Sequence, residues 1–495
     1  MKILFVETVA AKPHLETAAE IIFNYKKNKN NEIKFAWLGD NLLWTDWKLP
    51  VICGFFRFSY RKRIDNFINF LTNNKIECTN FSNNNLINNY NEIVNWANNF
   101  KGNLHDLRKY KYKKFPLGEG VASSIISYFR NENIELDKIN NYVQQLLISA
   151  AIVIERVIKL IIIEKPNIII TFNGRFSICY PIALVANKMK IKILFHDRGA
   201  SYDKYEIFKK NIHDHDFRAR EIKRYWKLTK NEKKKYYIGK QHFLKRRNRE
   251  PVDMGFSFVK NQKKNYLSFN NIKKRIVVFY TATDYEQAAA VYDYNQENVF
   301  RDFLTVINSF KDIHLIIRVH PGLNIKNNVE DKKWNKYSSR NVTVINSDDK
   351  TDTYKLMDIA DIIVTYSSRI IVETVYWGKK SISLSNVMFY SRFGIGLHPH
   401  KKTYNKNILK NILKPDYKFK EINKKKCLYV GYYFETYGIK YKYYKPYDYF
   451  NGTFNEQQFQ WKPVILIFLE KIKVNLLYRF IKNKFLYNFF SSRIS

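Results

Sequence analysis

The chain alternates short runs of apolar and β-branched residues with helix-like segments, and it does so in two separate blocks. The strand-like runs of the first block are residues 2–8, 31–39, 166–174 and 191–199. Those of the second block are residues 275–282, 314–321, 341–347, 361–368 and 380–385. Strands of this kind, separated by helices, are typical of a parallel sheet that is covered on both faces. The alternation predicts an α/β protein with two Rossmann-like, doubly wound domains facing a central cleft, followed by a C-terminal helical tail.

The length of 495 residues is too great for one comfortable core, and an apolar content of 45% is ample for two. We expect an N-terminal domain over residues 1–265 and a second Rossmann-like domain over residues 266–405. Residues 406–495 would form a basic, amphipathic helical extension. Residues 218–250 are polar and very basic, which indicates a surface helix and linker without a sheet strand.

The net charge is strongly positive, with 85 Lys and Arg against 45 Asp and Glu. A charge of +40 attracts polyanions such as nucleic acid, anionic lipid or phosphorylated substrates. Lys, Asn and Ile are enriched together, however, which suggests an AT-rich genome in which Lys is the default surface residue. The positive charge is therefore explained either by compositional drift or by a specific site for a polyanion, and both explanations remain open. There is no RNA-recognition signature, zinc finger or helix-turn-helix, so no specific nucleic-acid partner is expected.

The cysteines and the chain ends indicate a cytoplasmic protein. Four scattered cysteines without a CxxC pair suggest neither a zinc site nor a disulfide framework. The opening MKILFVETVA is typical of a first strand rather than a signal peptide, and no apolar stretch is long enough to span a bilayer. Residues 463–490 mix aliphatic and aromatic residues with Lys and Arg. This segment is either an amphipathic helix on the anionic inner face of the cytoplasmic membrane or a helix that packs on the domains.

The strongest constellation of polar residues lies in the second block. Arg318, His320 and Pro321 end one buried strand. Tyr366, Ser367 and Ser368 form the corner between a later strand and its helix, which also carries Glu373. Ligands of open parallel sheets bind beyond the carboxyl ends of the strands, and hydroxyl and N–H groups at a helix start bind anions. A strand-end His is alternatively structural, and a Ser pair is alternatively only a helix cap.

The loop after the first strand of this block carries Thr281 and Thr283, which would face the same cleft. Its alternative role is to cap the next helix. We expect Glu373 to reach the ribose hydroxyls of a nucleotide while the Ser corner holds its phosphate. Together these residues predict a donor-binding site.

In the first block, polar residues also follow two strands. Asn173, Gly174 and Arg175 end one strand, and Asp197 and Arg198 end another. A group-transfer reaction at a hydroxyl needs a base for the proton and cations that offset a leaving phosphate. Asp197 is the first choice for that base.

Three further residues belong to the same hypothesis. His14 and Glu16, which follow the first strand, are the rivals of Asp197 as the base. Glu119, in a glycine-flanked loop, would contact the acceptor together with Asn173 and Gly174. Alternatively, Asp197 is a structural partner of Arg198 or Arg175.

The order NGR, HDRG, RVHP and TYSS, ending in ETVYWGK, resembles bacterial glycosyltransferases of capsule polysaccharide and surface carbohydrate biosynthesis. The resemblance covers most of residues 1–400. It implies a GT-B fold and a nucleotide-sugar donor, often a CMP-linked acidic sugar, held by His320, Pro321, Ser367 and Ser368. The acceptor would be a growing capsule or lipopolysaccharide glycan, free or lipid-linked. Asp197 stands where Glu is more usual, and Thr281-Ala282-Thr283 where Thr-Ser-Ser is commoner, which puts donor or acceptor choice in doubt.

Two alternatives remain open. Glycerophosphotransferases that use CDP-glycerol share the His-Pro strand end, but their corner carries an Asp where this chain has Thr365. A non-catalytic basic protein that binds membrane or nucleic acid would explain the charge but not the polar strand ends. The chain lacks a GxxxxGK[ST] loop, HExxH and GxSxG, and shows no metal dyad, so we expect neither a metal site nor a cofactor.

Overall fold

The computed structural model divides the chain into two units, each with its own β-sheet. The described residues are 1–40, 42, 54–80, 89–129, 131–211, 213–250, 259–269, 272–283, 288, 295–323, 329–399, 405–419, 424–448 and 451–454. Unit 1 comprises Met1–Ile212 and the segment that returns to it from Gly438, and unit 2 comprises His213–Tyr437.

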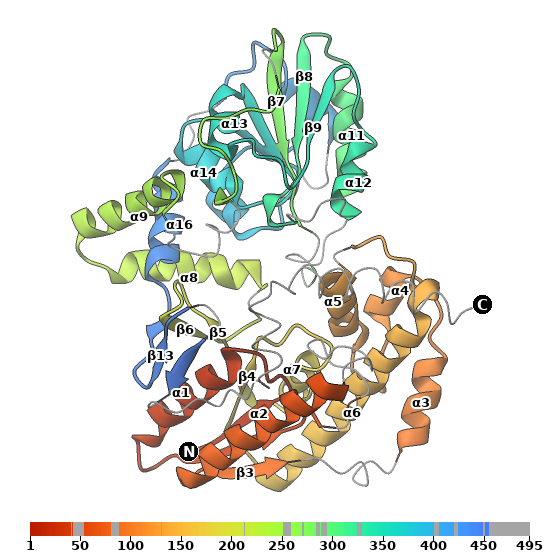
Figure 1. Ribbon diagram of the computed structural model, residues 1–495, viewed down its shortest axis with the longest axis vertical. Helices are drawn as coiled ribbons and strands as arrows, with labels where there is room; N and C mark the ends of the chain where they lie inside the picture. The colour runs from red at the N-terminus through yellow and green to blue at the C-terminus, as the bar shows by residue number, and fades with distance from the viewer. Residues whose placement is uncertain are drawn as a thin grey trace. The chain divides into compact units, whose positions relative to one another are not determined.

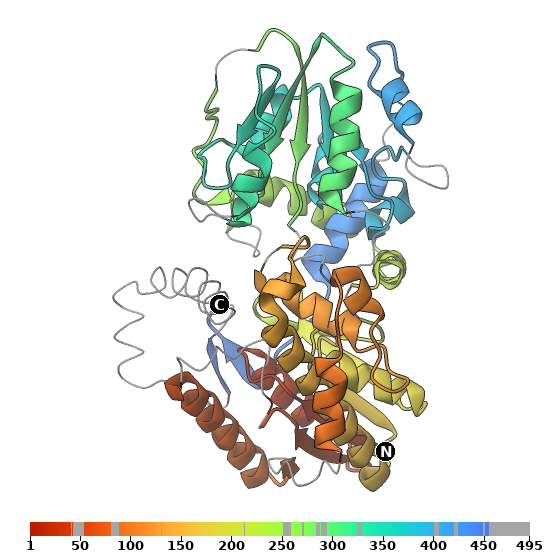
Figure 2. The same cartoon turned by 90° about the vertical axis from the view of Figure 1, so that its right-hand side faces the viewer.

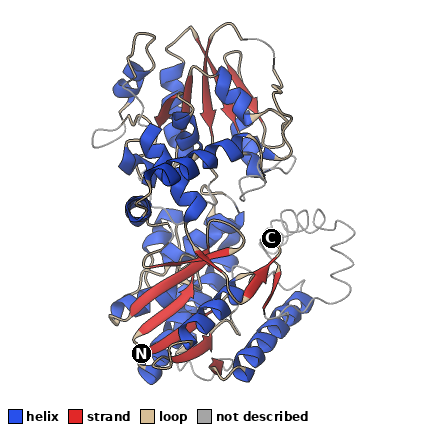
Figure 3. Cartoon of the chain, turned by 90° about the vertical axis from the view of Figure 1, so that its left-hand side faces the viewer, coloured by secondary structure: helices blue, strands red, loops and turns tan. Residues whose placement is uncertain are grey.

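Unit 1 is built on a seven-stranded sheet in the order β12-β6-β5-β4-β1-β2-β3 (Figures 1 and 3). From β5 to β3 all neighbouring strands are parallel, whereas β6 is antiparallel to both β5 and β12. The strands are β1 (Lys2–Glu7), β2 (Glu32–Trp37), β3 (Glu77–Asn80), β4 (Ile168–Phe172), β5 (Lys192–Arg198), β6 (Lys204–Phe208) and β12 (Ile439–Lys440). The chain order thus reverses between β1 and β4, which is the topological switch point of this sheet.

Helices cover the sheet of unit 1 and bury its apolar strands. They are α1 (His14–Lys26), α2 (Gly54–Asn73), α3 (Tyr90–Asn98), α4 (Leu104–Lys109), α5 (Gly118–Phe129), α6 (Asn140–Glu164) and α7 (Tyr180–Lys188). Alternate residues of the strands, such as Ile3, Phe5 and Phe35, pack against α1 and α2 in one core. Helix α6 ends at Glu164, because Lys165 adopts a left-handed conformation and Pro166 cannot continue the helix.

Unit 2 contains a five-stranded, fully parallel sheet in the order β11-β10-β7-β8-β9. The strands are β7 (Arg275–Tyr280), β8 (Ile313–Arg318), β9 (Val342–Ile345), β10 (Ile362–Thr365) and β11 (Lys380–Ser383). Val277 and Phe279 enter one core, whereas the intervening Ile276 and Val278 enter another, so β7 is buried on both faces. This explains its continuous apolar sequence.

The helices of unit 2 fall into two groups. Those that cover the sheet are α11 (Gln296–Ile307), α12 (Val329–Asn335), α13 (Thr353–Ile359), α14 (Ile370–Tyr376) and α15 (Lys406–Ile412). Figure 2 shows α11 running alongside the strands. The others, α8 (His215–Leu228), α9 (Glu232–Arg247) and α16 (Lys424–Thr436), form a helical group that packs on α14 and on the 3-10 turn Phe389–Phe393.

The α/β class and the two Rossmann-like sheets are confirmed, but the predicted domain boundaries are wrong. Helices α8 and α9 belong to unit 2 rather than to a domain 1–265, because Phe243 and Ile222 share a core with α14 and α16. The extension 406–495 is not a separate helical domain either. Helices α15 and α16 are part of unit 2, and residues 438–454 return to unit 1 as β12, β13 (Tyr444–Pro446) and β14 (Gly452–Phe454).

The segment 463–490, predicted to be amphipathic, lies outside the described residues. None of the helices in the described part of the chain combines the length and apolar character needed to span a bilayer.

Candidate functional site

The sequence-predicted donor residues gather at the carboxyl edge of the sheet of unit 2. The strand order reverses between β7 and β10, so a crevice is expected between the loops that follow these two strands. Thr281 and Thr283 follow β7 directly, His320 and Pro321 follow β8, and Ser367 and Ser368 follow β10. The topology thus brings all three motifs to one edge.

The loops after β7 and β8 are bonded to each other. The backbone N–H of His320 donates to Oγ1 of Thr281 at 3.0 Å, and the N–H of Thr281 donates to the carbonyl of Arg318 at 3.1 Å. The ring Nδ1 of His320 accepts from the N–H of Gly322 at 3.1 Å. A neutral ring with this bond carries its proton on Nε2, which makes Nε2 the donor of the imidazole.

Within the described part of the chain, the hydroxyl of Thr283 has no hydrogen-bond partner, although the residue is only 1% exposed. A buried hydroxyl without a partner costs about 1–3 kcal/mol relative to a satisfied one. At the switch point of a parallel sheet, such a hydroxyl is expected where a bound polar ligand supplies the missing hydrogen-bond partner.

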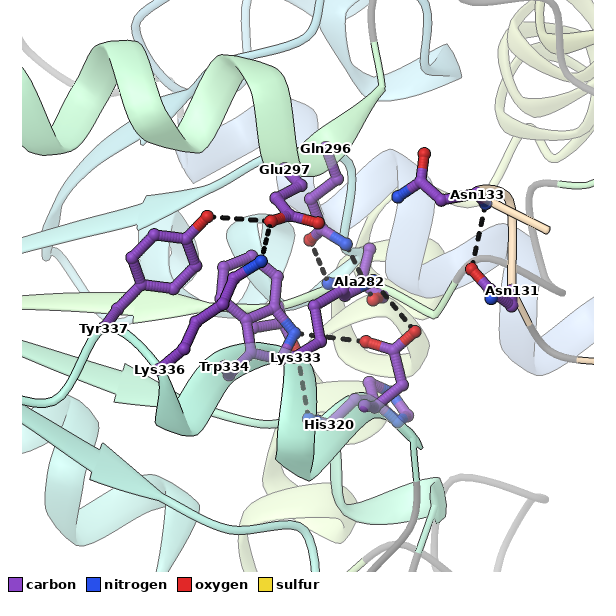
Figure 4. Close-up of polar contacts among 12 residues, drawn as sticks. Asn131, Asn133, Ala282, Gln296, Glu297, His320, Lys333, Trp334, Lys336 and Tyr337 are labelled. Atoms are coloured by element: carbon purple, nitrogen blue, oxygen red, sulfur yellow. Dashed lines mark hydrogen bonds and ion pairs between the residues drawn. The ribbon is translucent and has the colours of Figure 1, made fainter. Parts of the chain in front are cut away.

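The amide of Gln296 holds the β7 loop in place. Its Oε1 accepts from the N–H of Ala282 at 2.7 Å, and its Nε2 donates to the carbonyl of Ala282 at 3.0 Å (Figure 4). Gln296 is the first residue of α11 and is 2% exposed. Gln296 was not predicted from the sequence, because its partner is the backbone of Ala282, fourteen residues earlier in the chain.

The neighbouring Glu297 links the start of α11 to the two residues that follow α12, Lys336 and Tyr337. It accepts from the hydroxyl of Tyr337 at 2.8 Å and from the ammonium of Lys336 (Figure 4). It also accepts from the guanidinium of Arg301 at 3.1 Å. Burial would raise the pKa of Glu297, but these three donors together hold it at about 2. The carboxylate is therefore ionised at neutral pH and fixes the start of α11.

The corner after β10 is tied to the end of β7. Oγ1 of Thr365 donates to the carbonyl of Tyr280 at 2.9 Å and accepts from the N–H of Ser368 at 3.1 Å. The hydroxyl of Ser368 accepts from the N–H of Ile370 at 3.4 Å, as a helix cap does. The Ser367 side chain is buried, and that of Tyr366 packs into the core. Tyr366 can therefore offer a ligand its backbone more readily than its phenol.

Two predicted donor residues are engaged elsewhere. The guanidinium of Arg318 is 1% exposed and donates to the backbone carbonyls of Asn346 and Asp349, so it holds the loop after β9. Burial lowers its pKa. Glu373 accepts from Nε of Arg246 at 3.1 Å and from the hydroxyl of Tyr354 at 2.6 Å. Its contact with a ribose stays a prediction.

In unit 1, the predicted residues after β4 and β5 meet at the carboxyl edge. Nδ2 of Asn173 donates to Oδ2 of Asp197 at 2.7 Å, and Oδ1 of Asp197 accepts from the N–H of Arg198 at 2.7 Å. Asn173 and Gly174 both have positive φ, of 54° and 78°. Glycine is required at 174, because a Cβ would lie 2.3 Å from the ring of Phe195.

The partner of Asp197 is therefore Asn173 and the backbone rather than the guanidinium of Arg198 or Arg175. The guanidinium of Arg175 lies 4.2 Å from the ring centre of Phe176. That of Arg198 reaches the carbonyl of Lys12, at 3.4 Å, in the loop before α1. Asp197 and both arginines keep part of their surface open to solvent, as groups that contact a substrate must.

A buried acid–imidazole pair, which the sequence analysis missed, lies under this edge. Nε2 of His196 is 2.6 Å from Oε1 of Glu7, and both side chains are at most 1% exposed. Burial raises the pKa of Glu7, and the nearby His196 opposes that rise. A Glu that ends the apolar run KILFVE was the signal available in the sequence.

His14 lies close to this pair. Its ring is 3.7 Å from the ring of Phe172, centre to centre, and it is 6% exposed. Burial, and after it the positive charge of Arg198, lowers the pKa of His14 well below its usual value. His14 is therefore neutral at neutral pH and keeps a lone pair that can accept a proton.

Glu16 does not meet the requirement for a base. Nη2 of Arg63 donates to both of its carboxylate oxygens, at 2.9 and 2.8 Å, and the pair is buried.

Glu119 forms an ion pair with Arg108 at 2.5 Å, and burial raises its pKa. Arg63 and Arg108 lie on helices from which no site residue was predicted.

Within the described residues, no group of three or more His, Cys, Asp or Glu side chains is arranged to hold a metal ion.

No family model matches the chain, and no curated protein does. Among solved structures it is similar to the β-Kdo 2,4 transferase KpsC of Thermosulfurimonas dismutans, with 14% identity and a TM-score of 0.36 over 50% of this chain and 79% of that one. It is also similar to the UDP-GlcNAc 2-epimerase of Neisseria meningitidis bound to UDP-GlcNAc, with 13% identity and a TM-score of 0.27 over 89% and 96% of the two chains. At these scores the likeness is one of distant backbone similarity, and no activity is carried over from it.

Proposed function

We propose that the chain is a GT-B glycosyltransferase that moves a sugar from a nucleotide-activated donor onto a growing surface glycan. The observation that carries the proposal is the gathering of Thr283, His320 and Ser368 at the switch point of the parallel sheet of unit 2. A nucleotide offers this edge a phosphate and a ribose, both of which need hydroxyl and N–H partners.

On the donor side, the hydroxyl of Thr283 would bind an oxygen of the nucleotide, and Nε2 of His320 would donate to a phosphate. The Ser367–Ser368 corner would offer further donors. The bonds from Gln296 to Ala282 and from Thr365 to Ser368 would keep these loops in place without contacting the ligand. A CMP-linked donor is the form that the motif resemblance favours, and the surface glycan would be a capsule or a lipopolysaccharide.

On the acceptor side, a hydroxyl oxygen of the glycan would attack the anomeric carbon of the donor sugar while the bond to the phosphate oxygen breaks. The acceptor proton would pass to Asp197, and the electron pair of the broken bond would leave with the nucleotide. Asn173 would orient Asp197 through its 2.7 Å bond. The cations of Arg175 and Arg198 would offset negative charge in the transition state.

His14 is the second candidate for the base, because its lowered pKa keeps it neutral. Glu16 is not proposed again, since its carboxylate is taken by Arg63.

Nucleotide binding tests the donor side. Since a ligand that binds only the folded protein raises the melting temperature, we expect one of CMP, UDP or GDP to stabilise the chain. His320→Ala and Thr283→Val should each reduce that shift while leaving the melting temperature without nucleotide nearly unchanged. Thr305→Val, an exposed hydroxyl on α11, is the matched control. Stabilisation by CDP-glycerol and by no sugar nucleotide would favour the glycerophosphotransferase alternative.

Transfer kinetics test the acceptor side. Asp197→Asn keeps the shape of the side chain and its bond to the backbone of Arg198, but it cannot take a proton. We expect turnover to fall by a factor of about 100 or more with little change in donor affinity. Full turnover of Asp197→Asn, combined with inactivity of His14→Gln, would move the base to His14.

A further inference from the structure

A cluster of lysines occupies one end of the helical group of unit 2, and we call it the α8–α9 tip. Helices α9 and α16 run in the same direction. Near their beginnings, Lys425 of α16 lies 5.9 Å from the ring centre of Tyr236 of α9, and near their ends, Glu435 of α16 contacts His242 of α9. The first turn of α16 thus lies beside the first turn of α9 and the preceding turn from α8. In Figure 1 that turn is at the end of the α8–α9 hairpin far from β7 and β8. The lysines of the tip are Lys227, Lys230, Lys233, Lys234, Lys235, Lys424, Lys425 and Lys426.

Among the described residues, few carboxylates lie near the lysines of the tip. Over the described residues 227–237 and 424–426, Glu232 is the one acidic residue, and it pairs with the buried Lys235 at 2.5 Å. The exposed lysines of the tip, which form no ion pair in the described part of the chain, are Lys227, Lys230, Lys233, Lys234, Lys424 and Lys425. At the other end of α9, by contrast, every cation is matched. Lys245, Arg246 and Arg247 each bind a carboxylate there, those of Glu435, Glu373 and Asp358.

Two large apolar side chains stand out from the same surface. Leu228, the last residue of α8, is 65% exposed, and Tyr237, on the second turn of α9, is 64% exposed. The ring of Trp226 in α8 packs on Tyr429 of α16 at 4.1 Å and on Tyr236 of α9 at 5.3 Å, so aromatic contacts join the three helices of the tip. Exposed apolar side chains beside exposed lysines are unfavourable in water. They suit the interface of an anionic bilayer, which offers both an apolar medium and negative charge.

We propose that the α8–α9 tip docks on an anionic lipid surface. The exposed lysines would contact lipid phosphates, while Leu228 and Tyr237 enter the boundary between headgroups and acyl chains. A nucleic-acid backbone would satisfy the lysines equally, but it offers no apolar medium for Leu228, so lipid accounts for both features. The inference is independent of sugar transfer and of the segment 463–490.

Vesicle sedimentation of the full chain tests the electrostatic part. We expect the protein to pellet with phosphatidylcholine vesicles that contain phosphatidylglycerol and not with phosphatidylcholine alone. Each lysine near such a surface contributes about 1 kcal/mol, or roughly fivefold, so reversing three should lower binding by about 100-fold or more. The variant is Lys230→Glu/Lys233→Glu/Lys234→Glu. Its control, Lys109→Glu/Lys111→Glu/Lys114→Glu, changes the net charge equally on exposed residues of unit 1 and should lower binding far less.

A second variant tests the apolar part without changing charge. Leu228→Ser/Tyr237→Ser should bind at low salt and dissociate at high salt, where lysine contacts are screened and the native chain is still retained. All variants should keep the native melting temperature, because the substituted side chains are exposed. Binding equal to that of the native chain in both variants would overturn the proposal and assign any membrane affinity to another surface. Tighter binding to duplex DNA than to the vesicles, lost in the lysine variant alone, would identify a nucleic-acid surface instead.

Discussion

Replacing Glu20 by alanine should release the segment that returns from unit 2 to unit 1. Glu20 lies on α1 and is 0% exposed. Its carboxylate accepts from three consecutive backbone N–H groups, those of Lys442 at 2.9 Å, Tyr443 at 2.8 Å and Tyr444 at 3.0 Å. Nδ2 of Asn24 donates to the same carboxylate at 2.9 Å. One side chain thus satisfies a whole turn of the returning chain.

The magnitude follows from these bonds. A hydrogen bond to a charged group contributes about 1.5–3 kcal/mol, and a buried donor left without a partner loses a similar amount. The three bonds are not additive, since water can reach some of the N–H groups once the carboxylate is gone. We therefore expect a loss of about 4 kcal/mol in the stability of this contact, which corresponds to roughly a 1,000-fold rise in its opening equilibrium.

Hydrogen exchange measured by mass spectrometry reports this opening directly. The peptide that contains Lys442, Tyr443 and Tyr444 should exchange about 1,000-fold faster in Glu20→Ala, provided that local opening governs its exchange. Glu32→Ala is the matched control, because it removes the same charge from an exposed pair with Lys2. Native protection of residues 442–444 in Glu20→Ala would show that the returning segment is held by other contacts.

Three further perturbations test individual contacts. Arg63→Met should lower the free energy of unfolding by about 3–5 kcal/mol in chemical denaturation, because Glu16 is left buried and unpaired; a native value would refute the pairing. Gly174→Ala should lower the melting temperature, because the new Cβ meets Phe195; unchanged melting would contradict the turn geometry. Glu297 has a folded pKa of about 2, so its stabilisation is complete above its unfolded pKa and is lost as the pH falls from about 4.5 towards 2. Glu297→Gln should flatten that part of the pH–stability curve, and an unaltered curve would exclude the contribution.

The strands of both sheets were predictable because the apolar runs that form them are local features of the sequence. Runs such as RIVVFY are apolar on both sides, and the structure buries both sides of β7. The motifs lie at the carboxyl edges of their sheets, since the position of a residue at the end of a parallel strand fixes where it emerges. The end of α6 is also a local feature, because the left-handed Lys165 followed by proline stops a helix by local geometry alone.

The errors concern contacts between residues far apart in the chain. Nothing in GIKYKYYKP indicates that Ile439 pairs with Tyr205 in β6, or that Glu20 binds the N–H groups that follow. Glu16 looked like a possible base because its partner Arg63 lies 47 residues away on another helix.

The same limit applies to the acid–imidazole pair. Glu7 and His196 are 189 residues apart in the chain and meet only because β5 lies two strands from β1. Pairings of this kind depend on the sheet order, which a single sequence does not specify.

A crystal structure of the chain soaked with the nucleotide that gives the largest thermal shift would locate the donor site. We predict nucleotide density beyond the carboxyl ends of β7, β8 and β10, with its polar atoms within hydrogen-bond distance of Thr283 and His320. Density for the nucleotide at any other place on the chain, with the hydroxyl of Thr283 still unbonded, would contradict it.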